Sequence, residues 1–157
     1  MPTETIRRPA ISIVQSGPCP LLSFALTGEE LFSIAQVSRV SRDDLGQLVG
    51  YQRPEVRRHV DDIASYLSSG NVLFPNPIIL ALSSSARFIP SSSNGENQVL
   101  AGMLEIDLPA ENQPKPAWIV DGQQRALALD RLKSDLLVPV NAFLTDDENI
   151  QRDQFLR

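Results

Sequence analysis

The sequence predicts an α+β fold, a mixed α/β arrangement in which helices pack on a small mixed sheet. Short apolar segments bounded by proline, glycine and asparagine predict strands, and segments with helical periodicity alternate with them. The chain has 157 residues, of which 42% are hydrophobic and 21% charged, values typical of a globular protein. Because no internal repeat or interdomain linker interrupts the pattern, we expect one domain over residues 1–157.

Six apolar segments predict the main strands of the sheet. They cover residues 11–15, 21–26, 78–82, 102–108, 117–120 and 136–144. Residues 78–82 follow two prolines that exclude a helix, and they are apolar throughout, which indicates burial on both faces. Residues 102–108 alternate between apolar and polar side chains, which indicates one buried face. The Ser-rich segment before them predicts a long surface loop around a short strand, which could form a hairpin with residues 102–108.

Three helices begin at local signals. Thr27 and Glu30 form a capping box, and the apolar stripe that follows it predicts a helix through residues 27–37. Pro54 suits the first position of a second helix, whose apolar residues repeat at helical spacing until Gly70 stops it. A third helix follows the DGQQR segment and runs to about Lys133.

Composition excludes several classes of protein. Cys19 is the only cysteine, so the chain has no internal disulfide and no cysteine-based zinc cluster, and the reducing cytoplasm is the expected compartment. His59 is the only histidine, and no ligand spacing indicates a metal. No apolar run approaches the roughly 20 residues that span a bilayer, which predicts no membrane segment. The net charge of −5 argues against a protein that coats nucleic acid along its whole surface.

The DGQQR segment, residues 121–125, lies between a predicted strand and a predicted helix. A helix that starts at a glycine leaves several backbone N–H groups free, and the helix dipole makes its start a natural phosphate site. Gly122 would allow close approach, Arg125 offers a guanidinium fork, and Gln123 and Gln124 add neutral hydrogen-bonding groups. Asp121 could cap the helix or hold Mg²⁺ against the phosphates. The alternative is an ordinary Asp-Gly turn with an exposed arginine.

A second candidate site lies where a loop enters the helix that starts at Pro54. Gln52 and Arg53 come just before this helix, and Arg57, Arg58 and His59 lie in its first half. Two arginine-bearing helix starts could face one phosphate chain; the alternative is a solvated helix face. We expect a half-buried, hydrogen-bonded His59, with a phosphate donor or a general acid/base as the other interpretation.

Five blocks of the sequence resemble the DGQHR-domain proteins, which include the DndB family of DNA phosphorothioation clusters. In order, they are TGEELFSIAQVSRVSRD, GYQRPEVRRHVDDIASYL, NVLFPNPIILAL, WIVDGQQRALAL and QRDQFLR. The chain is also similar to the ParB/sulfiredoxin-like superfamily in its arginine-led helix, the strand after it, and its strand–G-x-x-R–helix turn. The resemblance spans nearly the whole chain and implies a single DGQHR/ParB-like domain.

The resemblance implies a nucleotide-binding accessory or regulatory protein of a DNA-modification system, in which ATP or another nucleotide, with Mg²⁺ beside it, would bind at the DGQQR turn. ATP hydrolysis is known in the family, but Gln124 replaces the histidine of its motif and cannot titrate. One alternative is a DNA-binding transcriptional regulator. Another is a ParB-like small-molecule kinase, for which Glu55 and Asp62 would be candidate bases. A sulfiredoxin activity is excluded because the turn contains no cysteine. The expected partners are DNA and DNA-modification proteins.

The C-terminal segment predicts one further helix. Thr145 and Glu148 form a second capping box, and Ile150, Phe155 and Leu156 give the segment an apolar side. Because the family's relatives run past this point, we expect a form truncated at the C-terminus. An apolar patch left by the missing part could produce a homo-oligomer.

Overall fold

The computed structural model describes residues 4–17, 19–37, 54–91 and 98–145. In chain order, its elements are β1 (Thr5–Ile13), β2 (Leu21–Thr27), α1 (Gly28–Ile34), β3 (Ala35–Val37), α2 (Pro54–Leu67), β4 (Ile78–Leu82), β5 (Ala86–Pro90), β6 (Val99–Asp107), β7 (Ala117–Asp121), α3 (Gln123–Leu132) and β8 (Leu137–Leu144). These elements confirm the predicted α+β class.

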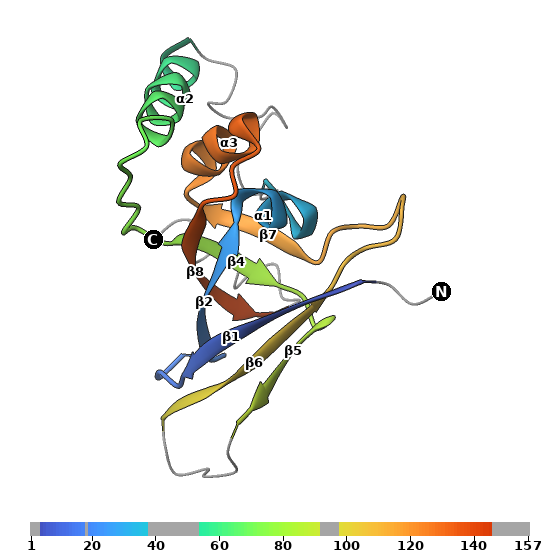
Figure 1. Ribbon diagram of the computed structural model, residues 1–157. Helices are drawn as coiled ribbons and strands as arrows, with labels where there is room; N and C mark the ends of the chain where they lie inside the picture. Colours follow the sequence, from blue (N-terminus) through green and yellow to red (C-terminus); the bar gives the residue numbers. More distant parts are fainter. Residues whose placement is uncertain (1–3, 18, 38–53, 92–97, 146–157) are drawn as a thin grey trace.

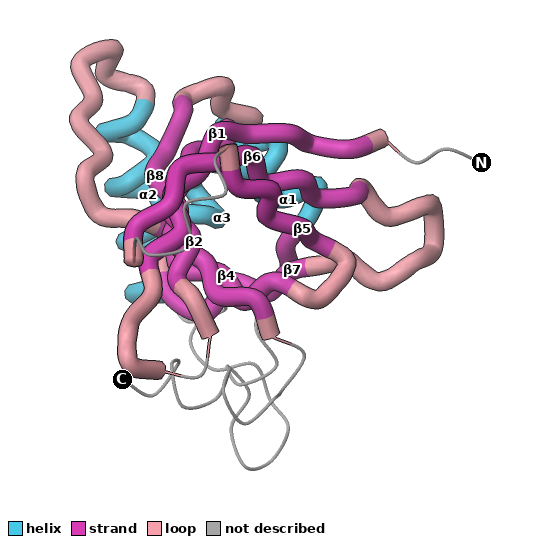
Figure 2. Tube along the Cα trace, turned by 90° about the horizontal axis from the view of Figure 1, so that it is seen from below, coloured by secondary structure: helices cyan, strands magenta, loops and turns pink. Residues whose placement is uncertain are grey.

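The described strands form one mixed sheet in the order β3-β7-β4-β8-β2-β1-β6-β5. Only β3 with β7 and β4 with β8 pair in parallel, and the other neighbours are antiparallel. The sheet curls, so that in Figure 2 its strands trace an arc. Figure 1 shows the three helices together at one end, while β1, β5 and β6 extend from the other. The helices are therefore grouped around the β7–α3 connection.

Alternating apolar residues build the core between the sheet and helices α1 and α3. Along β2, Leu22, Phe24 and Leu26 point inward, and along β6 Leu104 and Ile106 do the same. In β4, four of the five residues are buried, which confirms the strand predicted to be covered on both faces. The hairpin predicted around the Ser-rich segment is also confirmed, because β5 pairs antiparallel with β6.

The capping box at the start of α1 is confirmed. Thr27 Oγ1 accepts a hydrogen bond from the Glu30 backbone N–H at 3.1 Å, and Glu30 Oε1 accepts one from the Thr27 N–H at 2.9 Å. Glu30 also pairs with Arg8 of β1. Partial burial acts to raise the pKa of Glu30, but the Thr27 and Arg8 hydrogen bonds outweigh it and lower that pKa below its usual value. The cap thus also ties α1 to the neighbouring strand.

Several boundaries differ from the sequence prediction, and strand pairing explains two of them. The first helix ends at Ile34 instead of continuing to residue 37, since Ala35 is extended and pairs with Ala117 in β7. The first strand begins at Thr5 instead of residue 11. Its N-terminal half is polar in sequence but has cross-strand partners, such as Glu105, which lies 2.9 Å from Arg7.

Helix α2 begins at Pro54 as predicted, and its main contact is with α3. Val60 and Ala64 are buried against Ala128 of α3, and Ile63 packs against the same cluster. Gly70 adopts a positive φ of 82° just after the helix, as a C-terminal stop requires.

No helix among the described residues is long and apolar enough to cross a membrane.

Two expectations about the C-terminus are not tested by the structure. The predicted C-terminal helix starts at the edge of the described residues, because residues 146–157 lie outside them. Thr145 itself is described, and its N–H donates to the Leu82 carbonyl at 2.7 Å. The expected truncation and the apolar patch that would accompany it therefore stay predictions.

Candidate functional site

The DGQQR segment forms the predicted turn from a strand into a helix. Strand β7 ends at Asp121, and Gly122 is the N-cap residue of α3, with φ 90° and ψ 22°. The helix then starts with the hydrogen bond from the Ala126 N–H to the Gly122 carbonyl at 2.9 Å. Figure 1 places this turn where α3, β7 and β4 come together.

Gly122 is required by the protein's own packing. Its φ lies in the left-handed region, which side chains strain. A Cβ at this position would also lie 2.7 Å from Ile78 Cδ1 and 3.0 Å from Arg125 Nη2. The space beside the glycine is thus filled by two side chains of the protein.

Asp121 does not cap α3, which corrects one of the two roles considered for it. The N-cap residue is Gly122, and no side chain donates or accepts a capping hydrogen bond there. Asp121 is still part of β7, one residue too early to cap, and it is exposed. The described residues contain no group of three or more His, Cys, Asp or Glu side chains that could hold a metal ion. Mg²⁺ binding by Asp121 with phosphates stays a prediction.

The two glutamines of the turn differ in their environment. Gln123 Nε2 donates to the Val120 carbonyl at 2.9 Å and so fixes the turn on the end of β7. Gln124 is half-buried, and no described residue hydrogen-bonds its side chain. The first turn of α3 contains no acidic residue, and its N-terminal N–H groups have no side-chain cap. The start of α3 therefore offers free N–H donors at the positive end of the helix dipole, next to the exposed carboxylate of Asp121.

Arg125 is anchored to the segment that leads into β4. Its Nη1 donates to the Asn76 carbonyl, its Nη2 donates to the Pro77 carbonyl at 3.3 Å, and its guanidinium lies 5.6 Å from the centre of the Phe74 ring. No carboxylate pairs with Arg125 within the described ranges. Its positive charge is thus held in place but not neutralised by an acid. These partners of Arg125 could not be predicted from sequence. Two of them are backbone carbonyls, which every residue has and which therefore give no sequence signal.

Helices α2 and α3 run antiparallel. Asp61, near the middle of α2, pairs with Arg131 at the C-terminal end of α3. Ile63 and Leu67, further along α2, line a cavity together with Arg125 at the start of α3. The C-terminal half of α2 therefore lies beside the DGQQR turn, and its N-terminal half lies beside the other end of α3.

This arrangement separates the two arginine-bearing helix starts that could have shared one phosphate chain. Arg57, Arg58 and His59 lie in the N-terminal half of α2, and Arg57 is about 15 Å along the helix from Leu67. The structure does not bring these residues to the DGQQR turn. Gln52 and Arg53 lie outside the described residues.

The expectation of a half-buried His59 is wrong. The side chain is exposed, as are those of Arg57 and Arg58. The physical reason is that α2 packs mainly on a single helix, so only a narrow stripe of it, centred on Val60 and Ala64, is covered. A residue adjacent to that stripe stays in solvent.

The fold and the turn define a class: an α+β protein in which a strand of a curled mixed sheet leads through a glycine into a helix without a side-chain cap. The chain matches the sequence profile of the DndB family, described as DNA-sulfur modification-associated, over residues 8–156, and it belongs to that family. No curated protein and no solved structure matches the chain. The similarity to the ParB/sulfiredoxin-like superfamily stays a prediction.

Family membership associates the chain with DNA phosphorothioation. This confirms the predicted connection to a DNA-modification system. The match runs from within β1 to beyond β8 and therefore includes both the DGQQR turn and α2.

Proposed function

We propose that this DndB-family chain is a nucleotide-binding accessory or regulatory protein of a DNA-phosphorothioation system, and that it holds phosphates at the start of α3. One observation carries the proposal. The first turn of α3 has no side-chain cap and no acidic residue, and Arg125 beside it has no carboxylate partner in the part of the chain that the structure describes. Free N–H groups, the helix dipole and a positive side chain together favour an anion.

Each residue of the turn would have its own role in nucleotide binding. The backbone N–H groups of Gln123 and Gln124 would donate to phosphate oxygens, and the Gln124 side chain would add a neutral donor. Asp121, exposed at the end of β7, would bind Mg²⁺ that also contacts the phosphates. ATP is the nucleotide that the family resemblance favours. Since Gln124 cannot accept or release a proton, the proposal concerns binding and assigns no catalytic residue.

Replacement of Arg125 tests the turn directly. We expect Arg125→Ala to weaken ATP binding about tenfold or more, because a charge-assisted hydrogen bond contributes roughly 1.5–3 kcal/mol. Calorimetry with ATP, ADP and CTP, with and without Mg²⁺, measures the effect. Arg131→Ala is the matched control, because Arg131 lies at the opposite end of the same helix in an exposed ion pair. If a folded Arg125→Ala protein binds ATP with unchanged affinity, Arg125 has no role in nucleotide binding. Its role is then structural, through its contacts with Asn76 and Pro77.

DNA binding is the second candidate function. The three consecutive exposed residues Arg57, Arg58 and His59 on α2 favour it. Asp61 and Asp62 follow after Val60, and the net charge is −5, so we expect weak or no duplex binding by this chain alone. Fluorescence anisotropy with labelled duplex over a salt series measures this, with Arg58→Ala as the variant. Tight binding at physiological ionic strength that weakens steeply with salt and with Arg58→Ala would rank the DNA-binding function first.

A further inference from the structure

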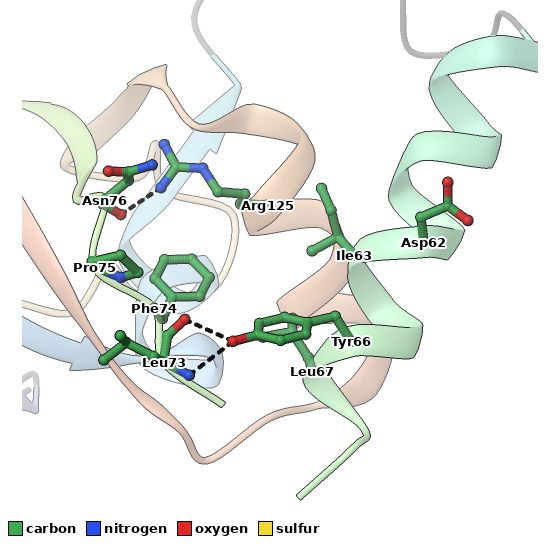
Figure 3. Close-up of a pocket in the computed structure, with 9 residues that line it drawn as sticks. All are labelled: Asp62, Ile63, Tyr66, Leu67, Leu73, Phe74, Pro75, Asn76 and Arg125. Atoms are coloured by element: carbon green, nitrogen blue, oxygen red, sulfur yellow. Dashed lines mark hydrogen bonds between the residues drawn. The ribbon is translucent and has the colours of Figure 1, made fainter. Parts of the chain in front are cut away.

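An apolar cavity of about 320 Å³ opens beside the start of α3 (Figure 3). One wall is the C-terminal half of α2, with Ile63, Tyr66 and Leu67. The opposite wall is the segment before β4, where Phe74 lies next to Arg125. The volume lies at the lower end of the roughly 300–1,000 Å³ that small-molecule sites occupy. It is suited to a ring system rather than to a complete nucleotide.

The walls of this cavity are held in fixed positions. The Tyr66 hydroxyl donates to the Leu73 carbonyl at 3.0 Å and accepts from the Leu73 N–H at 2.9 Å, so its polar group is already satisfied. Figure 3 shows these two hydrogen bonds bridging α2 to the opposite segment. The aromatic rings of Tyr66 and Phe74 therefore present apolar surface to the cavity without an unpaired hydroxyl. Such surfaces favour a flat aromatic guest.

Charge at the edge of the cavity narrows the chemical class of the guest. The Arg125 guanidinium stacks near the Phe74 ring and keeps its charge, as described above. At the rim, Asn76 offers an exposed amide, whereas the carboxylate of Asp62 points away from the cavity (Figure 3). The Asn76 amide can accept a hydrogen bond from an exocyclic amine and donate one to a ring nitrogen. A ligand that fits both the apolar walls and the nearby helix start with its free N–H donors combines an aromatic heterocycle with negative charge.

We propose that this cavity holds the base of a nucleotide, with an amino-bearing base such as adenine as the preferred guest. The assignment rests on the proposed function, because the phosphates of the same molecule would lie at the start of α3. The base would lie between the Phe74–Arg125 wall and the Ile63–Tyr66 wall. Selectivity for a nucleotide over inorganic polyphosphate would then come from residues outside the DGQQR turn.

The test compares ATP, adenosine and inorganic tripolyphosphate by calorimetry on the whole chain. Phe74→Leu removes an aromatic ring while keeping an apolar side chain, and Leu73→Ser removes a 76% exposed leucine from the lining. We expect each variant to bind ATP and adenosine about fivefold or more weakly, as loss of a base–aromatic contact does. Tripolyphosphate affinity should be unchanged in Leu73→Ser, and it should fall less than ATP affinity in Phe74→Leu, whose ring also contacts Arg125. Leu137→Ser, at a leucine of β8 that is 61% exposed, is the matched control and should bind all three ligands as the unmodified chain does.

The outcomes separate the base site from the phosphate site. ATP binding that both variants leave unchanged overturns the base site and leaves the phosphate site standing. Tripolyphosphate binding as tight as ATP binding, with no binding of adenosine, has the same meaning. If neither ATP nor tripolyphosphate binds, the proposed function fails, and the base site fails with it. Thermal unfolding of Phe74→Leu and Leu73→Ser confirms that a lost affinity belongs to a folded protein.

Discussion

Gly122→Ala is expected to lower the free energy of unfolding by about 2–4 kcal/mol, the sum of backbone strain and overpacking. The alanine would have to keep φ near 90°, and its Cβ would come within 2.7 Å of Ile78 Cδ1. Relief of the contact would require either a new rotamer of the fully buried Ile78 side chain or a shift of β4 or the start of α3. Urea unfolding followed by circular dichroism measures the change.

Gly70→Ala provides the matched control for this substitution. Gly70 has a similar positive φ of 82°, but an added Cβ would meet no atom within 4 Å. Its substitution should therefore cost only the backbone strain, about 1 kcal/mol. The difference between the two variants isolates the crowding at the DGQQR turn. Equal losses would show that Ile78 can move aside and that the turn is not tightly packed.

Leu80→Ala is expected to lower the free energy of unfolding by about 2–5 kcal/mol. Leu80 is fully buried in the strand that lies between β7 and β8, so the cavity left behind cannot fill from solvent. The same measurement on Leu73→Ala, at an exposed leucine before the strand, should give a change within about 0.5 kcal/mol. Similar losses for the two variants would contradict the burial of β4.

Local signals predicted those elements whose cause is local. The capping box of Thr27 and Glu30, the start of α2 at Pro54 and its stop at Gly70 need only nearby residues, and all three are confirmed. Strand β3 and the first half of β1 were missed because their cause is pairing with β7 and β6, strands that are distant in sequence. Neither segment has the apolar pattern by which a strand is identified from sequence.

The candidate site also has one part that the sequence predicts and another part that it does not. The strand–glycine–helix turn could be predicted because its residues are consecutive. The cavity beside it could not, since it joins Ile63 and Tyr66 of α2 to Phe74 and to Arg125 of α3. The exposure of His59 could not be predicted either. The spacing of apolar residues shows which side of a helix is buried, but it does not show how wide a strip of that side neighbouring elements cover.

The position of β8 also has a consequence for biosynthesis. This strand is the last one described, yet it lies in the sheet between β2 and β4 and hydrogen-bonds to both. While the chain is still being translated, β2 and β4 each have an open edge that only residues 137–144 can fill. The sheet can therefore close only after residues 137–144 have left the ribosome. Until then, the two open edges are the segments most exposed to pairing with another nascent chain.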